Sequence, residues 1–240
     1  MSALWVVRHG QASFLAENYD KLSPLGERQA RLLGEHWLGT GVGFDRVHYG
    51  PAERQIRTGE IIGDLYRQAG RGWPEPEPDP DLDEFPAEAV VKRFLPGLMA
   101  KHAPLAAAVA EFQATSETGP KQRQFDRILR EVSQRWMAGE VPAAPDVPSW
   151  QDFCHRVEAA VGRIRASAPK SSRLAVFTSG GPTAATARVA LGLSYAATLE
   201  LTWSPRNASV SEFLFTQDRF SLSTFNATPH LTEPSLLTYR

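Results

Sequence analysis

The chain has 240 residues, of which 42% are hydrophobic and 10% aromatic, so a packed core is feasible and global disorder is excluded. Its formal net charge of -1 argues against nucleic acid as a partner but leaves room for a small anionic substrate. The single cysteine, Cys154, excludes an intrachain disulfide and fits a reducing compartment. The sequence shows neither a membrane-length apolar run nor a secretory signal, which predicts a cytoplasmic protein with no membrane partner.

The first part of the chain alternates between strand and helix patterns. Residues 4–7 form a continuous apolar run that is typical of a buried strand. A helical pattern runs from Leu25 to about Gly39, after a serine and a proline that suit its cap and first turn. A second strand is predicted at residues 46–49, and a second helix follows Gly50-Pro51.

The middle of the chain has a different composition. Residues 70–83 are rich in Pro, Gly and acidic side chains, which indicates a surface connection. Residues 84–147 are helix-prone and end in a proline-rich segment, so we interpret about 86–148 as a helical insertion within a single domain, 1–240. The insertion could be a lid, a pocket wall or a decoration. The predicted helical segments are 89–95, 106–112 and 125–137.

Strand and helix patterns resume at Trp150. A helix is followed by an apolar strand at residues 174–178, and a glycine-containing turn, 179–183, leads into an alanine-rich helix. Further strands are predicted near residues 199–203, 210–215 and 220–225. Alternating strands and helices predict an α/β fold with a mainly parallel central sheet flanked by helices, and with antiparallel strands late in the chain.

Polar groups follow three of the predicted strands. They are Arg8-His9-Gly10, Arg54 and the turn Ser179-Gly180-Gly181, and Glu84 joins them from the end of the proline-rich connection. Because the carboxyl ends of parallel strands share one edge of a sheet, we expect these groups to converge. A neutral His9 could attack phosphorus while Arg8 and Arg54 neutralise the phosphoryl oxygens.

Two further roles are open to the same groups. Glu84 is a candidate general acid for the leaving alcohol, with Asp83 as its rival, and the amides at Ser179 and Gly180 could hold an anion. Each group also has a structural alternative. His9 could be bonded to backbone, and Arg54 could be solvated, with Arg57 as its competitor for the role. Glu84 could be an exposed carboxylate, and the turn at Ser179 could be needed only for packing. The sequence lacks a Walker-type loop and metal-ligand spacing, so neither a cofactor nor a metal is predicted.

The order of these motifs resembles the histidine phosphatase superfamily, also called the phosphoglycerate mutase-like family. Arg8-His9-Gly10 looks like its signature, and Arg54 with Thr58 resembles its second phosphate-binding segment. The likeness covers roughly residues 1–85 and 149–231 and omits the helical insertion. The other segments that carry it are 22–30, 82–84, 150–157, 207–210 and 226–231.

The resemblance implies a metal-independent hydrolase of the histidine acid phosphatase type. His9 would become phosphorylated, Arg8 and Arg54 would clamp the phosphate, Glu84 would protonate the leaving group, and water would hydrolyse the phosphohistidine. The substrate would be a small phosphorylated molecule, whose identity the sequence does not determine. The oligomeric state is open as well.

Ser179 stands where relatives usually carry a second histidine, and Gly50 where a serine is common. Losing one charge-assisted contact costs a few kcal/mol of transition-state stabilisation, or roughly two to three powers of ten in rate. His48 and His230 are the histidines that could compensate. The favoured reading is therefore a phosphomonoesterase of reduced or unusual activity. An alternative is a catalytically impaired relative that binds a phosphorylated ligand or partner, and a phosphoglycerate mutase is the least favoured.

Overall fold

The computed structural model of the chain describes residues 1–13, 20–141, 144 and 147–239. These residues form two compact units. The first comprises Met1–Glu84 together with Cys154–Arg240, and the second is Phe85–Phe153. The second unit spans the predicted insertion at 86–148, whereas the interpretation of 1–240 as one domain stays a prediction.

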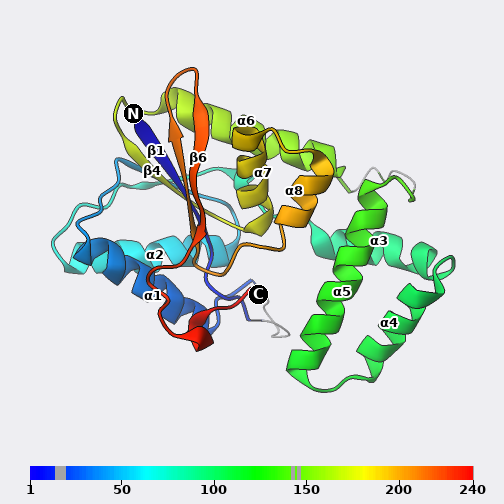
Figure 1. The fold of residues 1–240 in the computed structure, drawn as a ribbon. Coiled ribbons are helices and arrows are strands. Elements are labelled where there is room, and N and C mark those ends of the chain that lie inside the picture. Colours follow the sequence, from blue (N-terminus) through cyan, green and yellow to red (C-terminus); the bar gives the residue numbers. More distant parts are fainter. Residues whose placement is uncertain (14–19, 142–143, 145–146, 240) are drawn as a thin grey trace. The chain divides into compact units, whose positions relative to one another are not determined.

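A six-stranded mixed sheet forms the centre of the first unit, in the order β3-β2-β4-β1-β5-β6 (Figure 1). β1 and β2 both run parallel to β4, β3 runs parallel to β2, and β5 and β6 are antiparallel to their neighbours. The predicted α/β fold with a mainly parallel sheet and late antiparallel strands is therefore confirmed. The strands are β1 (Ser2–Arg8), β2 (Arg46–Tyr49), β3 (Pro76–Pro78), β4 (Arg173–Thr178), β5 (Val210–Phe215) and β6 (Phe220–Ala227).

Helices cover both faces of this sheet (Figure 1). α1 (Pro24–Gly39) and α2 (Glu53–Gln68) pack against each other on one face, and α6 (Trp150–Ser167) and α7 (Gly180–Leu191) lie on the other. The start of α1 is set by Ser23, whose hydroxyl accepts a hydrogen bond from Gly26 N at 3.1 Å, as its sequence predicts.

Apolar side chains from the strands and from α1 and α2 form one buried core. Val7, Val47 and Phe177 come from three neighbouring strands, and Trp37 and Tyr66 meet them from the two helices. Burial of this apolar surface holds β1, β2 and β4 in register, so that their carboxyl ends lie at one edge of the sheet.

The second unit is helical. Its helices are α3 (Ala87–Met99), α4 (Ala103–Ala114) and α5 (Thr118–Met137), each longer than the segment predicted for it. α5 packs against both α3 and α4 (Figure 1). Across the described ranges, none of the helices combines the length and apolar character that a membrane crossing requires.

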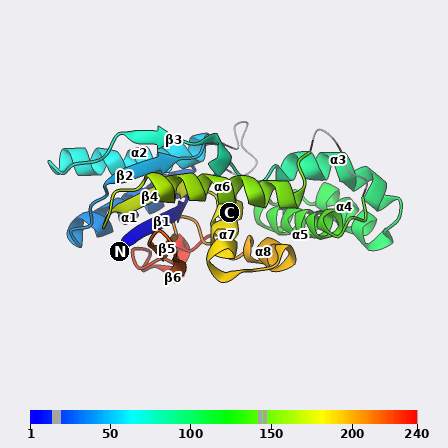
Figure 2. The same cartoon turned by 90° about the horizontal axis from the view of Figure 1, so that it is seen from above.

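Two local predictions differ from the structure. The predicted strand near residues 199–203 is wrong: residues 195–201 form helix α8 (Tyr195–Leu201). Its N-cap is Ser194, whose hydroxyl accepts from Ala197 N at 3.2 Å. The connection at 70–83 contains a short strand, β3, that the prolines concealed. Since proline cannot donate to a ladder, such a strand belongs at an edge, where β3 lies beside β2 (Figure 2).

Candidate active site

The main chain at the end of β1 is fixed from two sides. His9 N donates to Thr178 O of β4 at 2.9 Å, while His9 O accepts from Ala208 N at 3.1 Å and from Asn207 Nδ2 at 3.3 Å. Ala208 has a φ of 55°, in the left-handed region that few residues other than glycine adopt. A strained residue thus holds the backbone of His9 in place.

The imidazole of His9 is buried and has one defined tautomer. Nδ1 lies 2.6 Å from Gly10 O, and since a carbonyl oxygen only accepts, Nδ1 carries the proton. Nε2 then bears the lone pair, and Arg54 Nε donates to it at 3.1 Å. Burial, followed by the positive charges of Arg54 and Arg8, holds the pKa of His9 well below its usual value of 6.5. The ring is therefore neutral and nucleophilic at neutral pH.

Arg54 is the second residue of α2, and its position is set by two neighbours. Asp20 forms an ion pair with its guanidinium and also accepts a hydrogen bond from Glu53 N at 2.8 Å. Thr58, one helical turn later, donates to Arg54 O at 2.7 Å and accepts from Gly10 N at 3.1 Å. Thr58 therefore ties the start of α2 to the loop that follows His9.

Arg8 lies beside the first residue of α7. Its guanidinium donates to the carbonyl of Pro205, and a Cβ at Gly180 would lie 3.7 Å from Arg8 Nε and 3.1 Å from Thr202 O. A Cβ at position 180 would thus make ordinary contact with Arg8 and a tight one with the backbone oxygen of Thr202. The structure brings Arg8, His9 and Arg54 together, with Gly180 next to Arg8.

Glu84 lies at the start of α7. Its carboxylate oxygens accept from Gly181 N at 3.1 and 3.3 Å, so the turn in which the sequence predicts an anion cradle holds a carboxylate of the same chain. Its rival Asp83 turns back onto the main chain, where Oδ1 accepts from Glu84 N at 2.7 Å. The preceding connection is anchored by Thr178 Oγ1, which donates to Leu82 O at 2.6 Å.

Ser179 joins this region through a contact that the sequence does not predict. Gln55 Nε2 donates to Ser179 Oγ at 2.7 Å, and both residues are fully buried. Gln55, Asp20 and Asn207 are absent from the candidates derived from sequence. The helical neighbourhood of Arg54 could have drawn attention to Gln55, and the resemblance at 207–210 to Asn207, whereas no pattern in the sequence links Asp20 to His9.

Three other sequence candidates make their contacts elsewhere. Arg57 pairs with Glu27 and Glu60 on the surface. His48 Nδ1 lies 3.9 Å from a carboxylate oxygen of Glu77. The ring of His230 lies beside that of His36, with centroids 6.3 Å apart. These contacts do not include the imidazole of His9 or the guanidinium of Arg54.

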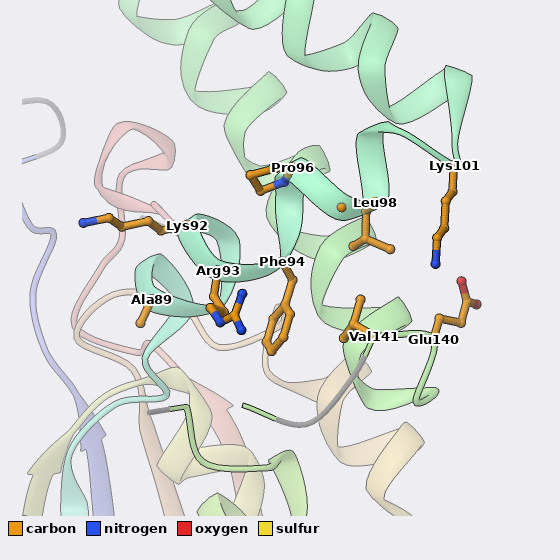
Figure 3. Close-up of a pocket in the computed structure, with 10 residues that line it drawn as sticks. Ala89, Lys92, Arg93, Phe94, Pro96, Leu98, Lys101, Glu140 and Val141 are labelled. Atoms are coloured by element: carbon orange, nitrogen blue, oxygen red, sulfur yellow. The ribbon is translucent and has the colours of Figure 1, made fainter. Parts of the chain in front are cut away.

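A cavity of about 670 Å³ lies in the second unit (Figure 3). Its lining includes Phe94 and Leu98 among apolar side chains and Lys92, Arg93 and Lys101 among basic ones. None of the candidate catalytic residues lines it. Within the part of the chain that the structure describes, no three His, Cys, Asp or Glu side chains are grouped as metal ligands would be.

The model of the histidine phosphatase superfamily (branch 1) matches residues 4–110 and 99–228. The chain belongs to this superfamily. The match includes Arg8, His9, Arg54, Glu84, Ser179 and Gly180, and also the helical insertion, for which the sequence motifs gave no resemblance. No curated protein matches the chain significantly.

Solved structures share the fold of this chain at low sequence identity. A phosphoglycerate mutase from Bacillus anthracis has a TM-score of 0.64 and 16% identity, over 96% of this chain and 95% of that one. A phosphoserine phosphatase from Entamoeba histolytica, in complex with 3-phosphoglyceric acid, has the same score and identity over 96% and 100%. A mycobacterial glucosyl-3-phosphoglycerate phosphatase has a TM-score of 0.62 and 19% identity over 94% and 99%.

Proposed function

We propose that this chain is a phosphomonoesterase that works through a phosphohistidine at His9. The observation that carries the proposal is the contact between Arg54 Nε and His9 Nε2, at 3.1 Å. It places a guanidinium beside the one ring nitrogen that is able to attack, in the tautomer that the Gly10 carbonyl selects. A phosphoryl group at this nitrogen would take over the hydrogen bonds of Arg54.

The reaction that we propose has two steps. His9 Nε2 attacks phosphorus, and the bond between phosphorus and the ester oxygen breaks while Glu84 gives its proton to the leaving alcohol. Water, losing a proton to Glu84, then attacks the phosphohistidine and releases inorganic phosphate and the neutral ring. Arg8 and Arg54 offset the negative charge of both transition states. These two cations are the reason for proposing that no metal takes part.

The proposed substrate is a small phosphate monoester. Two of the structural neighbours are a phosphoserine phosphatase and a glucosyl-3-phosphoglycerate phosphatase, which supports this chemical class without selecting a member of it. A binding function is the second candidate, because Ser179 and Gln55 are neutral and bring no further cation to the site. In that case a phosphorylated ligand would bind without turnover.

Turnover of a panel of phosphate esters separates these candidates. The panel contains p-nitrophenyl phosphate, phosphoserine and 3-phosphoglycerate, assayed with the wild type, His9→Ala and Ser179→His, with and without a chelator. We expect phosphate release by the wild type, unaffected by the chelator, and its loss in His9→Ala. Equal rates for wild type and His9→Ala would refute the role of His9, and binding without release would favour the second candidate. Conversion of 3-phosphoglycerate to its isomer would instead indicate a mutase.

A further inference from the structure

The hydroxyl of Ser179 does not cap the helix that it precedes. Ser179 is the N-cap residue of α7, a position at which serine usually accepts a hydrogen bond from an amide of the first turn. Its side chain makes no such bond. Among the described residues, the hydrogen bond from Gln55 Nε2 at 2.7 Å is the only one of the Ser179 hydroxyl. The hydroxyl is therefore turned toward α2.

The carboxamide of Gln55 has a defined orientation. Its Oε1 accepts from Ala52 N at 3.1 Å, and since a backbone amide only donates, the oxygen must face Ala52. Nε2 consequently faces Ser179, whose oxygen acts as the acceptor. The proton of the Ser179 hydroxyl is left for another acceptor. For a fully buried hydroxyl, an unused donor is costly unless a ligand accepts it.

Gly50 makes this arrangement possible. A Cβ at position 50 would lie 2.2 Å from Gln55 Oε1, much too close for two unbonded atoms. A serine at this position would therefore displace the carboxamide. Gly50, Gln55 and Ser179 thus depend on one another, although Gln55 and Ser179 are 124 residues apart in sequence.

Gln55 and Ser179 lie next to the candidate phosphate-binding residues. Gln55 follows Arg54, and Ser179 precedes Gly180, beside which Arg8 lies. We propose that Gln55 is a positioning residue, which keeps Ser179 Oγ as an acceptor so that the hydroxyl proton is donated to a phosphoryl oxygen held by Arg8 and Arg54. The proposal rests on the proposed function, since it requires that phosphate binds there.

A double-mutant cycle with inorganic phosphate as the ligand tests this role. Phosphate binding is measured by calorimetry for the wild type, Ser179→Ala, Gln55→Met and the double variant. We expect each single variant to bind phosphate roughly tenfold or more weakly, because a hydrogen bond to a charged group is lost. The double variant should bind no more weakly than either single one. Thr186→Val is the matched control: it removes a buried hydroxyl of α7 that donates to Pro182 O at 2.8 Å, and its phosphate affinity should equal that of the wild type.

The alternatives give different results. Additive losses in the double variant, or unchanged affinity in Gln55→Met, would show that Gln55 does not act through Ser179 and would overturn the proposal alone. If Gln55→Met does not fold, Gln55→Leu, which also lacks the donor, replaces it in the cycle. A wild-type protein that binds no phosphate would overturn the proposed function, and this inference with it.

Discussion

Replacing Gly10 with alanine places a methyl group where two backbone segments meet. A Cβ at position 10 would lie 2.3 Å from Gly26 O and 2.8 Å from Gly26 C. Both are main-chain atoms in the first turn of α1, so no side-chain rotation relieves the overlap. To reach ordinary contact at 3.4 Å, the loop and α1 must separate by about 1 Å.

This displacement would affect stability and activity together. Overpacking of this kind typically costs about 1–3 kcal/mol, which in a chain of this length lowers the melting temperature by roughly 2–12 °C. Gly10 also carries the carbonyl that selects the tautomer of His9, at 2.6 Å from Nδ1. A misplacement of about 1 Å at a reacting group can cost about a hundredfold in rate, so we expect kcat/KM to fall by that order.

The assay combines thermal unfolding with hydrolysis of p-nitrophenyl phosphate. Gly39→Ala is the matched control, because a Cβ at that position meets no atom within 4 Å, and we expect it to keep the stability and the rate of the wild type. If Gly10→Ala melts and reacts as the wild type does, the close approach of the loop and α1 does not constrain the site, and the reasoning fails.

Variants at three further positions test separate parts of the account. Thr58→Val should destabilise the fold by about 1–3 kcal/mol and slow turnover, because Gly10 N loses its partner, whereas Thr58→Ser should behave as the wild type in urea unfolding and in rate. Glu84→Gln should slow hydrolysis of alkyl phosphates far more than that of p-nitrophenyl phosphate, whose leaving group needs no proton; equal losses would contradict an acid role. Burial lowers the pKa of His230 to about 4, so between pH 6.5 and 4 this histidine takes up a proton in the unfolded chain but not in the folded one. The free energy of unfolding therefore decreases by up to about 3 kcal/mol over this range. His230→Phe should therefore reduce the fall in unfolding free energy over that range, and an unchanged pH dependence would refute this assignment.

Local pattern and the geometry of parallel sheets account for what the sequence could predict. Apolar runs identified β1 and β4, the segment that ends at Gly50-Pro51 was predicted as β2, and Ser23 marked the start of α1. Since the carboxyl ends of parallel strands share an edge, the proximity of Arg54 to His9 could be anticipated, and it is observed at 3.1 Å. The catalytic roles of these residues stay proposals.

What the sequence could not predict depends on contacts between distant segments. Prolines concealed β3, because an edge strand tolerates residues that an inner strand excludes. The buried hydrogen bond between Gln55 and Ser179 depends on the space left by Gly50, and the periodicity of apolar residues does not predict such a space. The ion pair of Asp20 with Arg54 is likewise a product of the tertiary fold.

Covalent labelling of the imidazole at position 9 tests the central claim most directly. The protein is mixed with a phosphate ester that carries a radiolabelled phosphoryl group, quenched within a turnover, and digested to locate the label. We expect acid-labile, base-stable phosphate on His9 in the wild type and none in His9→Ala. Label on another residue, or steady turnover with no labelled protein at any time, would contradict the account.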